Sequence, residues 1–160
     1  MHTKNTSVIN VTFEYNDNVL GIGCATPRIS WKISAITDNW TQKAYEIQLE
    51  NEDGSIRDTT GKTESSDSVF LQWPFNPLKS AERITIRVRV WGSDGSVSDW
   101  SHAYSAEAGL LDVQDWHAKF ITPDWDEDIS TPQQAPVMRK EVQIKSGVRK
   151  ARLYMTALGL

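Results

Sequence analysis

ITIRVRVWGSDGSVSDWS, the stretch from residue 84 to residue 101, decides the fold of this chain. Its first half alternates strictly between apolar and polar side chains, and the apolar set is Ile84, Ile86, Val88 and Val90. A period of two in β-branched residues is typical of a strand that is buried on one face. The opposite face, from Arg83 to Trp91, carries three arginines and a tryptophan. We therefore predict a long strand over residues 83–91 whose apolar face covers a core.

The residues after this strand predict a turn and a returning strand. Gly92-Ser93-Asp94-Gly95 contains glycines that can take positive φ, and residues 97–108 are expected to run back antiparallel. Trp100 can then lie over the face of Arg87 and Arg89, where a guanidinium on an exposed indole contributes roughly 0.5–1 kcal/mol. The DG-x-x-S-x-WS pattern resembles the F–G region of fibronectin type III domains, including the Trp-Ser element of cytokine receptors. We interpret this stack as structural support for one sandwich face, with a ligand platform as the alternative.

Short alternating segments separated by turn residues fill the rest of the first 109 residues. Asn51-Glu52-Asp53-Gly54 is a strong hairpin turn, and Trp31 alternates with apolar neighbours in a way that predicts a core position. Residues 20–28 are expected to form a loop. The expected strands cover residues 8–13, 29–33, 44–49, 56–60, 69–71, 83–91 and 97–108. About seven short strands without helical periodicity predict an all-β fold, an immunoglobulin or fibronectin type III-like β-sandwich over residues 1–109.

The character of the chain changes after Gly109. Residues 110–136 are predicted to be a linker or irregular segment, with a single helical turn near residues 110–116. Two further strands are expected over residues 138–144 and 149–157. Because two strands are too few for independent stability, we predict that residues 137–160 begin a second, truncated β-sandwich domain. Its open strand edges predict self-association with another copy of the chain, or packing against the first domain.

Composition and charge exclude several classes of function. The net charge is −4, so there is no basic excess of the kind that nucleic-acid binding requires. No apolar stretch is long enough to span a membrane, and no signal peptide follows Met1. We therefore expect a cytoplasmic protein without a membrane partner, unless an export leader has been removed. Cys24 is the single cysteine, which excludes an intrachain disulfide and a cysteine metal cluster.

No residue of this chain is predicted to be catalytic, to bind a cofactor or to hold a metal. The best local candidate for sugar chemistry is the acidic run from Asp124 to Asp128, which includes Trp125. Neighbouring acids on one loop do not flank a sugar from opposite faces, as glycoside hydrolysis by two carboxyl groups needs. The run also lacks the glycine and final glutamate of a calcium loop, since Ile129 and Ala135 stand there. The histidines show no ligand spacing, and they are His2, His102 and His117.

Three tryptophans, Trp40, Trp73 and Trp125, lie in predicted loops. If two of them were exposed and coplanar, they could stack on a sugar ring. We prefer the interpretation that they seal the ends of the sandwich or an interface with further domains. Cys24 has no identifiable base nearby in sequence, and we expect a small or partly buried thiol.

The order and spacing of short motifs from about Leu20 to Leu160 are similar to those in the N-terminal region of bacterial α-L-rhamnosidases. The chain departs from that family at Ile84 and Ile86, where aromatic residues are usual, and it lacks a tryptophan before Gly61. The matching pieces are Leu20–Ile22, Thr26–Trp31, Gln42–Ile47, Gly61–Lys62, Pro77–Ser80, Arg87–Trp91, Trp100–Ser101, Glu107–Leu111, Asp115–Ile121, Ala135–Glu141 and Ala151–Gly159.

This resemblance implies a fibronectin-like first region, a second β-sandwich beginning near Arg139-Lys140-Glu141, and catalytic acids in an α/α barrel that this chain lacks. It also implies a parent enzyme that hydrolyses terminal α-L-rhamnosides with inversion. No catalytic residue of the family carries over to a position here. We therefore expect a non-catalytic N-terminal fragment whose partners are the remaining domains and, through them, a rhamnoside. The alternative is a stand-alone fibronectin-like module that binds carbohydrate or protein.

Overall fold

The computed structural model describes residues 6–15, 19–35, 37–125, 130–132 and 135–157. The chain divides into two compact units, Met1–Trp116 and His117–Leu160. All strands of the described residues lie in the first unit, which also contains the 3₁₀ turn η1 (Val113–Asp115). That turn confirms the single helical turn predicted near residues 110–116. Among the described residues there is no helix with the length and apolar character needed to cross a membrane.

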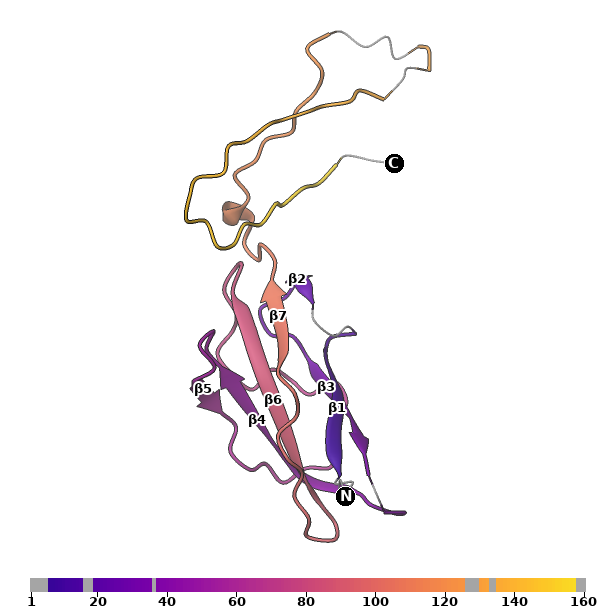
Figure 1. Cartoon of the computed structure of the whole chain (residues 1–160). Coiled ribbons are helices and arrows are strands. Elements are labelled where there is room, and N and C mark those ends of the chain that lie inside the picture. Colours follow the sequence, from indigo (N-terminus) through magenta and orange to yellow (C-terminus); the bar gives the residue numbers. More distant parts are fainter. Residues whose placement is uncertain (1–5, 16–18, 36, 126–129, 133–134, 158–160) are drawn as a thin grey trace. The chain divides into compact units, whose positions relative to one another are not determined.

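Two sheets form the first unit (Figure 1). The smaller sheet pairs β1 (Ser7–Phe13) with β3 (Ile29–Ser34) in antiparallel fashion. The larger sheet has the order β2-β7-β6-β4-β5, in which only β2 and β7 run parallel. Its strands are β2 (Leu20–Ile22), β4 (Gln42–Glu50), β5 (Ile56–Thr59), β6 (Arg83–Gly92) and β7 (Tyr104–Ala108). This arrangement confirms the predicted all-β sandwich.

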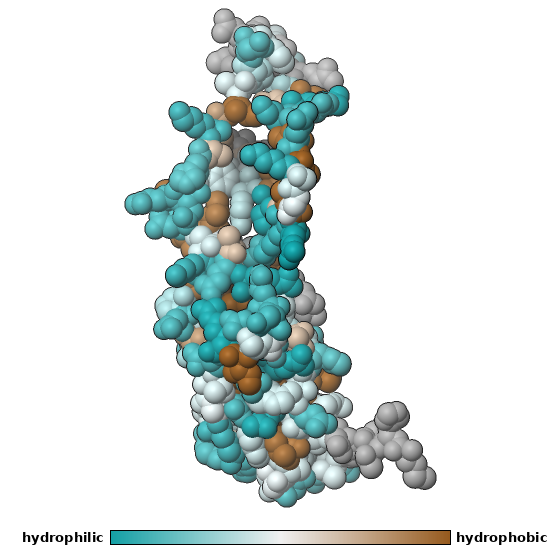
Figure 2. Space-filling view, turned by 60° about the vertical axis from the view of Figure 1, so that its left-hand side comes forward, coloured by the Kyte–Doolittle hydropathy of each residue, from teal (hydrophilic) through white to brown (hydrophobic). Residues whose placement is uncertain are grey.

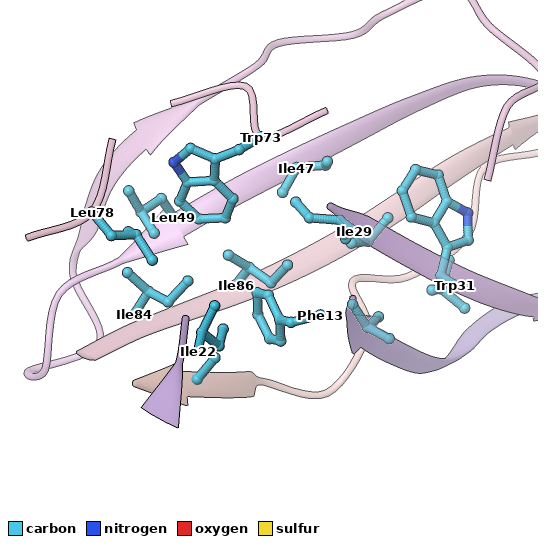
Figure 3. Close-up of a cluster of buried hydrophobic side chains, with 14 of the residues drawn as sticks. Phe13, Ile22, Ile29, Trp31, Ile47, Leu49, Trp73, Leu78, Ile84 and Ile86 are labelled. Atoms are coloured by element: carbon cyan, nitrogen blue, oxygen red, sulfur yellow. The ribbon is translucent and has the colours of Figure 1, made fainter. Parts of the chain in front are cut away.

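The core lies between the two sheets and is built on the apolar face of β6. Val88 lies opposite Ile47 of β4, and Ile86 lies opposite Leu49. Figure 3 shows side chains from β1, β3, β4 and β6 pointing toward one another. Fully burying such a side chain contributes about 1.5–3 kcal/mol, so the alternation read from the sequence supplies much of the stability. The largest side chains that are fully buried include Phe13, Ile29, Ile47, Ile84, Ile86, Val88 and Val90.

Trp31 occupies the core position predicted for it. Its side chain is buried, and its indole Nε1 donates to Oε1 of Gln42 at 3.0 Å. The Gln42 amide nitrogen in turn donates to the carbonyls of Ser65 and Asp67. The Trp31 ring meets the Tyr45 ring edge to face, with centroids 5.2 Å apart. Since its one polar atom has a partner, this tryptophan is buried without an unsatisfied donor.

The returning strand is shorter than predicted, because β7 begins only at Tyr104. Serine side chains replace part of the ladder before that point. The backbone N–H of Val90 donates to Oγ of Ser98, and that of Val88 donates to Oγ of Ser101, each at 3.0 Å. A serine hydroxyl can satisfy a strand N–H in place of a carbonyl. The serines of the Trp-Ser element therefore cap this edge of β6 rather than extend the sheet.

The strand predicted at residues 69–71 is reduced to a single bridge between Leu71 and Ile29. Phe70 has a φ of 52°, in the left-handed region. That conformation interrupts extended pairing, which explains why the smaller sheet has only two strands. Conversely, the segment predicted as a loop contains β2, three residues paired parallel to β7. Gly21, with a φ of 88°, breaks the local strand pattern there, so only tertiary pairing creates this strand.

The second unit contains no strand within its described residues. A turn at Ser146-Gly147 separates the two segments that were predicted to be strands, with Gly147 at a φ of 87°. The flanking strands, predicted over residues 138–144 and 149–157, are wrong for this structure, where the chain is irregular. Their apolar side chains remain exposed, including Ile144 and Leu153, at 75% and 81%. An alternating segment with no surface to cover gains nothing from becoming a strand.

Gly92 at the end of β6 provides a test of the packing. A Cβ built there would lie 2.5 Å from Oδ1 of Asp94 and within overlap of the Trp40 indole. We expect Gly92→Ala to destabilise the fold by about 1–3 kcal/mol, as overpacking usually does, measured by urea unfolding. Gly23→Ala is the matched control, because no atom lies within 4 Å of its added Cβ. Equal midpoints for the two variants would contradict this account of the turn.

Candidate functional site

The polar face of β6 carries a stack of cations and indole rings. The guanidinium carbon of Arg89 lies 4.5 Å from the centroid of the Trp100 ring and 5.0 Å from that of Trp91. The Nζ of Lys62 lies 5.4 Å from the Trp91 centroid. This geometry confirms the predicted contact between Trp100 and the arginine face. Each such contact is worth roughly 0.5–1 kcal/mol at an exposed site.

Two of the three arginines of this face, Arg87 and Arg89, are paired with carboxylates. Arg89 donates from Nε and Nη2 to the same oxygen of Glu46, Oε2, at 2.8 and 2.6 Å. Arg87 donates from Nε to Glu50 at 2.6 Å and from Nη1 to the carbonyl of Ser101. The glutamates are the more covered partners, with 11% and 10% of their side chains exposed. These two pairs support the sheet, as the structural interpretation predicts.

A second cluster, missed by the sequence reasoning, joins the ends of β1 and β3. Arg28 donates to the Glu14 carboxylate from its backbone N–H and from Nε and Nη2, at 2.8, 3.0 and 2.5 Å. The guanidinium lies over the ring of Phe70, 4.5 Å from the centroid, and 5.8 Å from that of Tyr15. The two rings meet edge to face at 5.4 Å. Phe70 is 42 positions beyond Arg28 in the sequence, so no local pattern indicates this contact.

Cys24 lies beside this cluster as a partly buried thiol, in agreement with the prediction. Its Sγ is 3.9 Å from Oε1 of Glu14. Burial, together with the negative charge of Glu14, raises the pKa of the Cys24 thiol. A raised pKa disfavours the thiolate, which is the nucleophilic form, so the surroundings of Cys24 do not activate it.

The loop tryptophans have different environments. Trp73 is buried in the core, and its Nε1 donates to the carbonyl of Asn76 at 2.8 Å. Trp40 packs against the core and donates to Oγ of Ser96 at 3.1 Å. Both side chains therefore close the sandwich, in agreement with the interpretation that we prefer. Trp125, in the second unit, is 58% exposed. Trp40 and Trp73 therefore do not form the exposed, coplanar pair that could stack on a sugar ring.

The remaining candidates bring no chemistry together within the described residues. His102 and His117 are exposed, while His2 and the acidic residues 126–128 lie outside the part of the chain that the structure describes. Among the described side chains, no group of three His, Cys, Asp or Glu could hold a metal ion. Asp124 is exposed in the second unit. The candidate sites are thus the two arginine clusters of the first unit.

Arg89→Met tests the energetic weight of the first cluster. We expect a loss of about 1–3 kcal/mol in unfolding free energy, because the covered Glu46 carboxylate keeps only its Thr59 hydrogen bond. Adding Glu46→Gln should recover part of that loss. Arg57→Met is the control, since the Arg57 side chain, which pairs with Glu82, is 43% exposed. Ion pairs at the surface contribute about 1 kcal/mol or less. Equal losses for Arg89→Met and Arg57→Met would refute the distinction.

Glu14 predicts a pH dependence of stability. The Arg28 hydrogen bonds hold the pKa of Glu14 below its ordinary value of 4.5. The unfolded chain therefore takes up the proton first as the pH falls. The difference in unfolding free energy between wild type and Glu14→Gln should have its full value above about pH 5. It should shrink as the pH falls through the pKa of Glu14 in the folded state. Thermal unfolding from about pH 3 to about pH 7 measures this difference, and a pH-independent difference would exclude the mechanism.

Comparison with known proteins places the chain in a family. Residues 8–112 match the family described as the Rha78A-like, N-terminal immunoglobulin domain. An α-L-rhamnosidase of Formosa agariphila is 30% identical over 154 residues, which are 89% of this chain and 17% of that protein. The α-L-rhamnosidase of Streptomyces avermitilis, solved in complex with L-rhamnose, has a TM-score of 0.67 and 32% identity over 71% of this chain and 12% of its own.

A third relative has the same relation to the chain. The α-L-rhamnosidase of Aspergillus terreus has a TM-score of 0.64 and 43% identity, over 70% of this chain and 13% of its own. The chain thus spans less than a fifth of the length of each of these relatives, and the resemblance to the N-terminal region of α-L-rhamnosidases is confirmed. With its two-sheet sandwich, its Trp-Ser edge and the match over residues 8–112, the chain belongs to the family of Rha78A-like, N-terminal immunoglobulin domains.

Proposed function

We propose that this chain is the non-catalytic N-terminal part of an α-L-rhamnosidase-like glycoside hydrolase that removes terminal α-L-rhamnose from rhamnosides. The observation that carries this proposal is the coverage of the relatives. As much as 89% of the chain aligns with α-L-rhamnosidases, yet it accounts for only 17% of the Formosa agariphila protein. The immunoglobulin domain contributes support to the catalytic part, and chemistry is left to the remainder of the enzyme.

The carboxylates of the first unit favour this supporting role. A general acid in glycoside hydrolysis needs a raised pKa so that it holds a proton near neutral pH. Hydrogen bonds from Arg28 lower the pKa of Glu14. Glu82 also has a lowered pKa, because its hydrogen bonds with Lys79 and Arg57 outweigh the raising effect of its partial burial. Acids held in this way are poor proton donors near neutral pH, so neither Glu14 nor Glu82 suits the general-acid role.

The exposed apolar side chains of the second unit support the presence of a partner. Its exposed apolar side chains recur along both predicted strands, at 74% for Val142 and 79% for Met155. In Figure 2 exposed apolar residues appear as separate brown patches among hydrophilic ones. A further part of the same enzyme is the partner that this proposal assigns to the segment. Self-association through residues 137–157 is the alternative use of the same side chains.

Hydrolysis of a chromogenic α-L-rhamnoside tests the proposal. We expect no hydrolysis by the 160-residue chain and saturable hydrolysis by the product of the full natural reading frame. The matching chromogenic β-D-glucoside is the control substrate and should not be cleaved by either protein. Activity of the short chain alone would overturn the non-catalytic assignment. Inactivity of the longer product would overturn the rhamnosidase assignment.

A further inference from the structure

The cluster of Glu14, Tyr15, Arg28 and Phe70 presents exposed aromatic rings at the joined ends of β1 and β3. The Tyr15 side chain is 74% exposed and Phe70 is 37% exposed. Val69, the neighbour of Phe70, is 65% exposed. Monomeric proteins bury most aromatic surface, so an exposed and ordered aromatic pair is a candidate contact surface.

Backbone conformation marks the same place. Glu14 and Phe70 have φ values of 54° and 52°, in the left-handed region that favours glycine. A bulky residue there is unfavourable and persists only when its surroundings hold it. Three hydrogen bonds between Arg28 and Glu14, and one from the Phe70 amide to Oγ of Ser30 at 2.8 Å, provide that support. Glycine at position 70 would remove the strain, so the ring is retained at a cost to the fold.

We propose that this cluster binds a neutral deoxy-sugar ring, the terminal α-L-rhamnose of a glycan, a proposal that rests on the proposed function. The exposed Tyr15 ring offers an apolar surface for the C–H face and methyl group of the sugar. The Arg28–Glu14 pair supplies fixed polar atoms at its side. Because one guanidinium and one carboxylate cancel in charge, the surface suits a neutral ligand rather than an anionic one. Because hydrogen bonds already order the polar groups, little entropy is lost on binding.

The size of the cluster also favours a sugar. A stable protein–protein interface buries roughly 800 Å² on each partner, whereas this cluster comprises a few side chains and matches one or two sugar rings. The other candidate rings are less exposed than that of Tyr15. Trp73 is buried in the core, and Trp91 and Trp100 are half-buried.

Titration of the ¹⁵N-labelled 160-residue chain with methyl α-L-rhamnopyranoside tests the site. We expect saturable shifts of the Phe70 and Tyr15 backbone amides, with a millimolar dissociation constant. Tyr15→Ser and Phe70→Gly should each weaken binding at least tenfold. Phe70→Gly should change the melting temperature little, because relief of the left-handed strain offsets the loss of the ring contacts with Arg28 and Tyr15. Trp125→Ser, which removes an exposed ring in the second unit, is the matched control and should bind as wild type does.

Three results would overturn the proposal. The first is the absence of a saturable shift, and the second is binding that both cluster variants leave unchanged. The third is an equal response to methyl β-D-glucopyranoside, which would remove the assignment to rhamnose. If sugar binding is absent while Tyr15→Ser destabilises the longer enzyme, the surface docks protein instead. Because binding is measured on this chain and hydrolysis on the longer product, failure of this site and failure of the proposed function are separately visible.

Discussion

Burial of one face of β6 is the constraint on which the rest of the first unit depends. The strand lies between β7 and β4 in the larger sheet, so its backbone is paired on both sides. Its apolar side chains all point into the core. Those side chains are at most 1% exposed from Ile84 to Val90. A register shift of one residue would exchange them with the arginines. That exchange would bury several charges, which fixes the register more firmly than any single hydrogen bond does.

The same constraint explains the opposite face. Once β6 is fixed, Arg87 and Arg89 are held side by side on the outer surface, where each needs a counter-charge. The neighbouring strand supplies it, because Glu46 lies directly opposite Arg89 in the antiparallel register. The indoles of Trp91 and Trp100 then cover the guanidinium. Arg87 and Arg89 are therefore paired, and both rings are in contact with a cation, so these groups are already engaged in holding the sheet.

Regular alternation allowed much of the fold to be predicted, and its interruptions explain what was missed. The core strands and the position of Trp31 follow from spacing within a few residues. The conformation of Phe70 does not, because its left-handed φ depends on partners that are distant in the sequence. Strand β2 is likewise created by pairing with β7, in which Leu20 lies opposite Glu107, 87 positions later in the sequence. The segments predicted as strands, residues 138–144 and 149–157, alternate as strands do. Alternation alone does not make a sheet when the apolar side chains have no surface to pack against.

The two arginine clusters differ in what they leave exposed, and that difference separates support from recognition. On the β6 face, the arginine is enclosed by rings on a regular strand, so the arrangement follows from the fold at no conformational cost. At the ends of β1 and β3, Arg28 and Glu14 are equally well paired, but two residues are held in left-handed conformations and a tyrosine ring remains mostly in solvent. Packing alone accounts for the first cluster. It does not account for the second, where a fold optimised only for stability would place glycine at position 70.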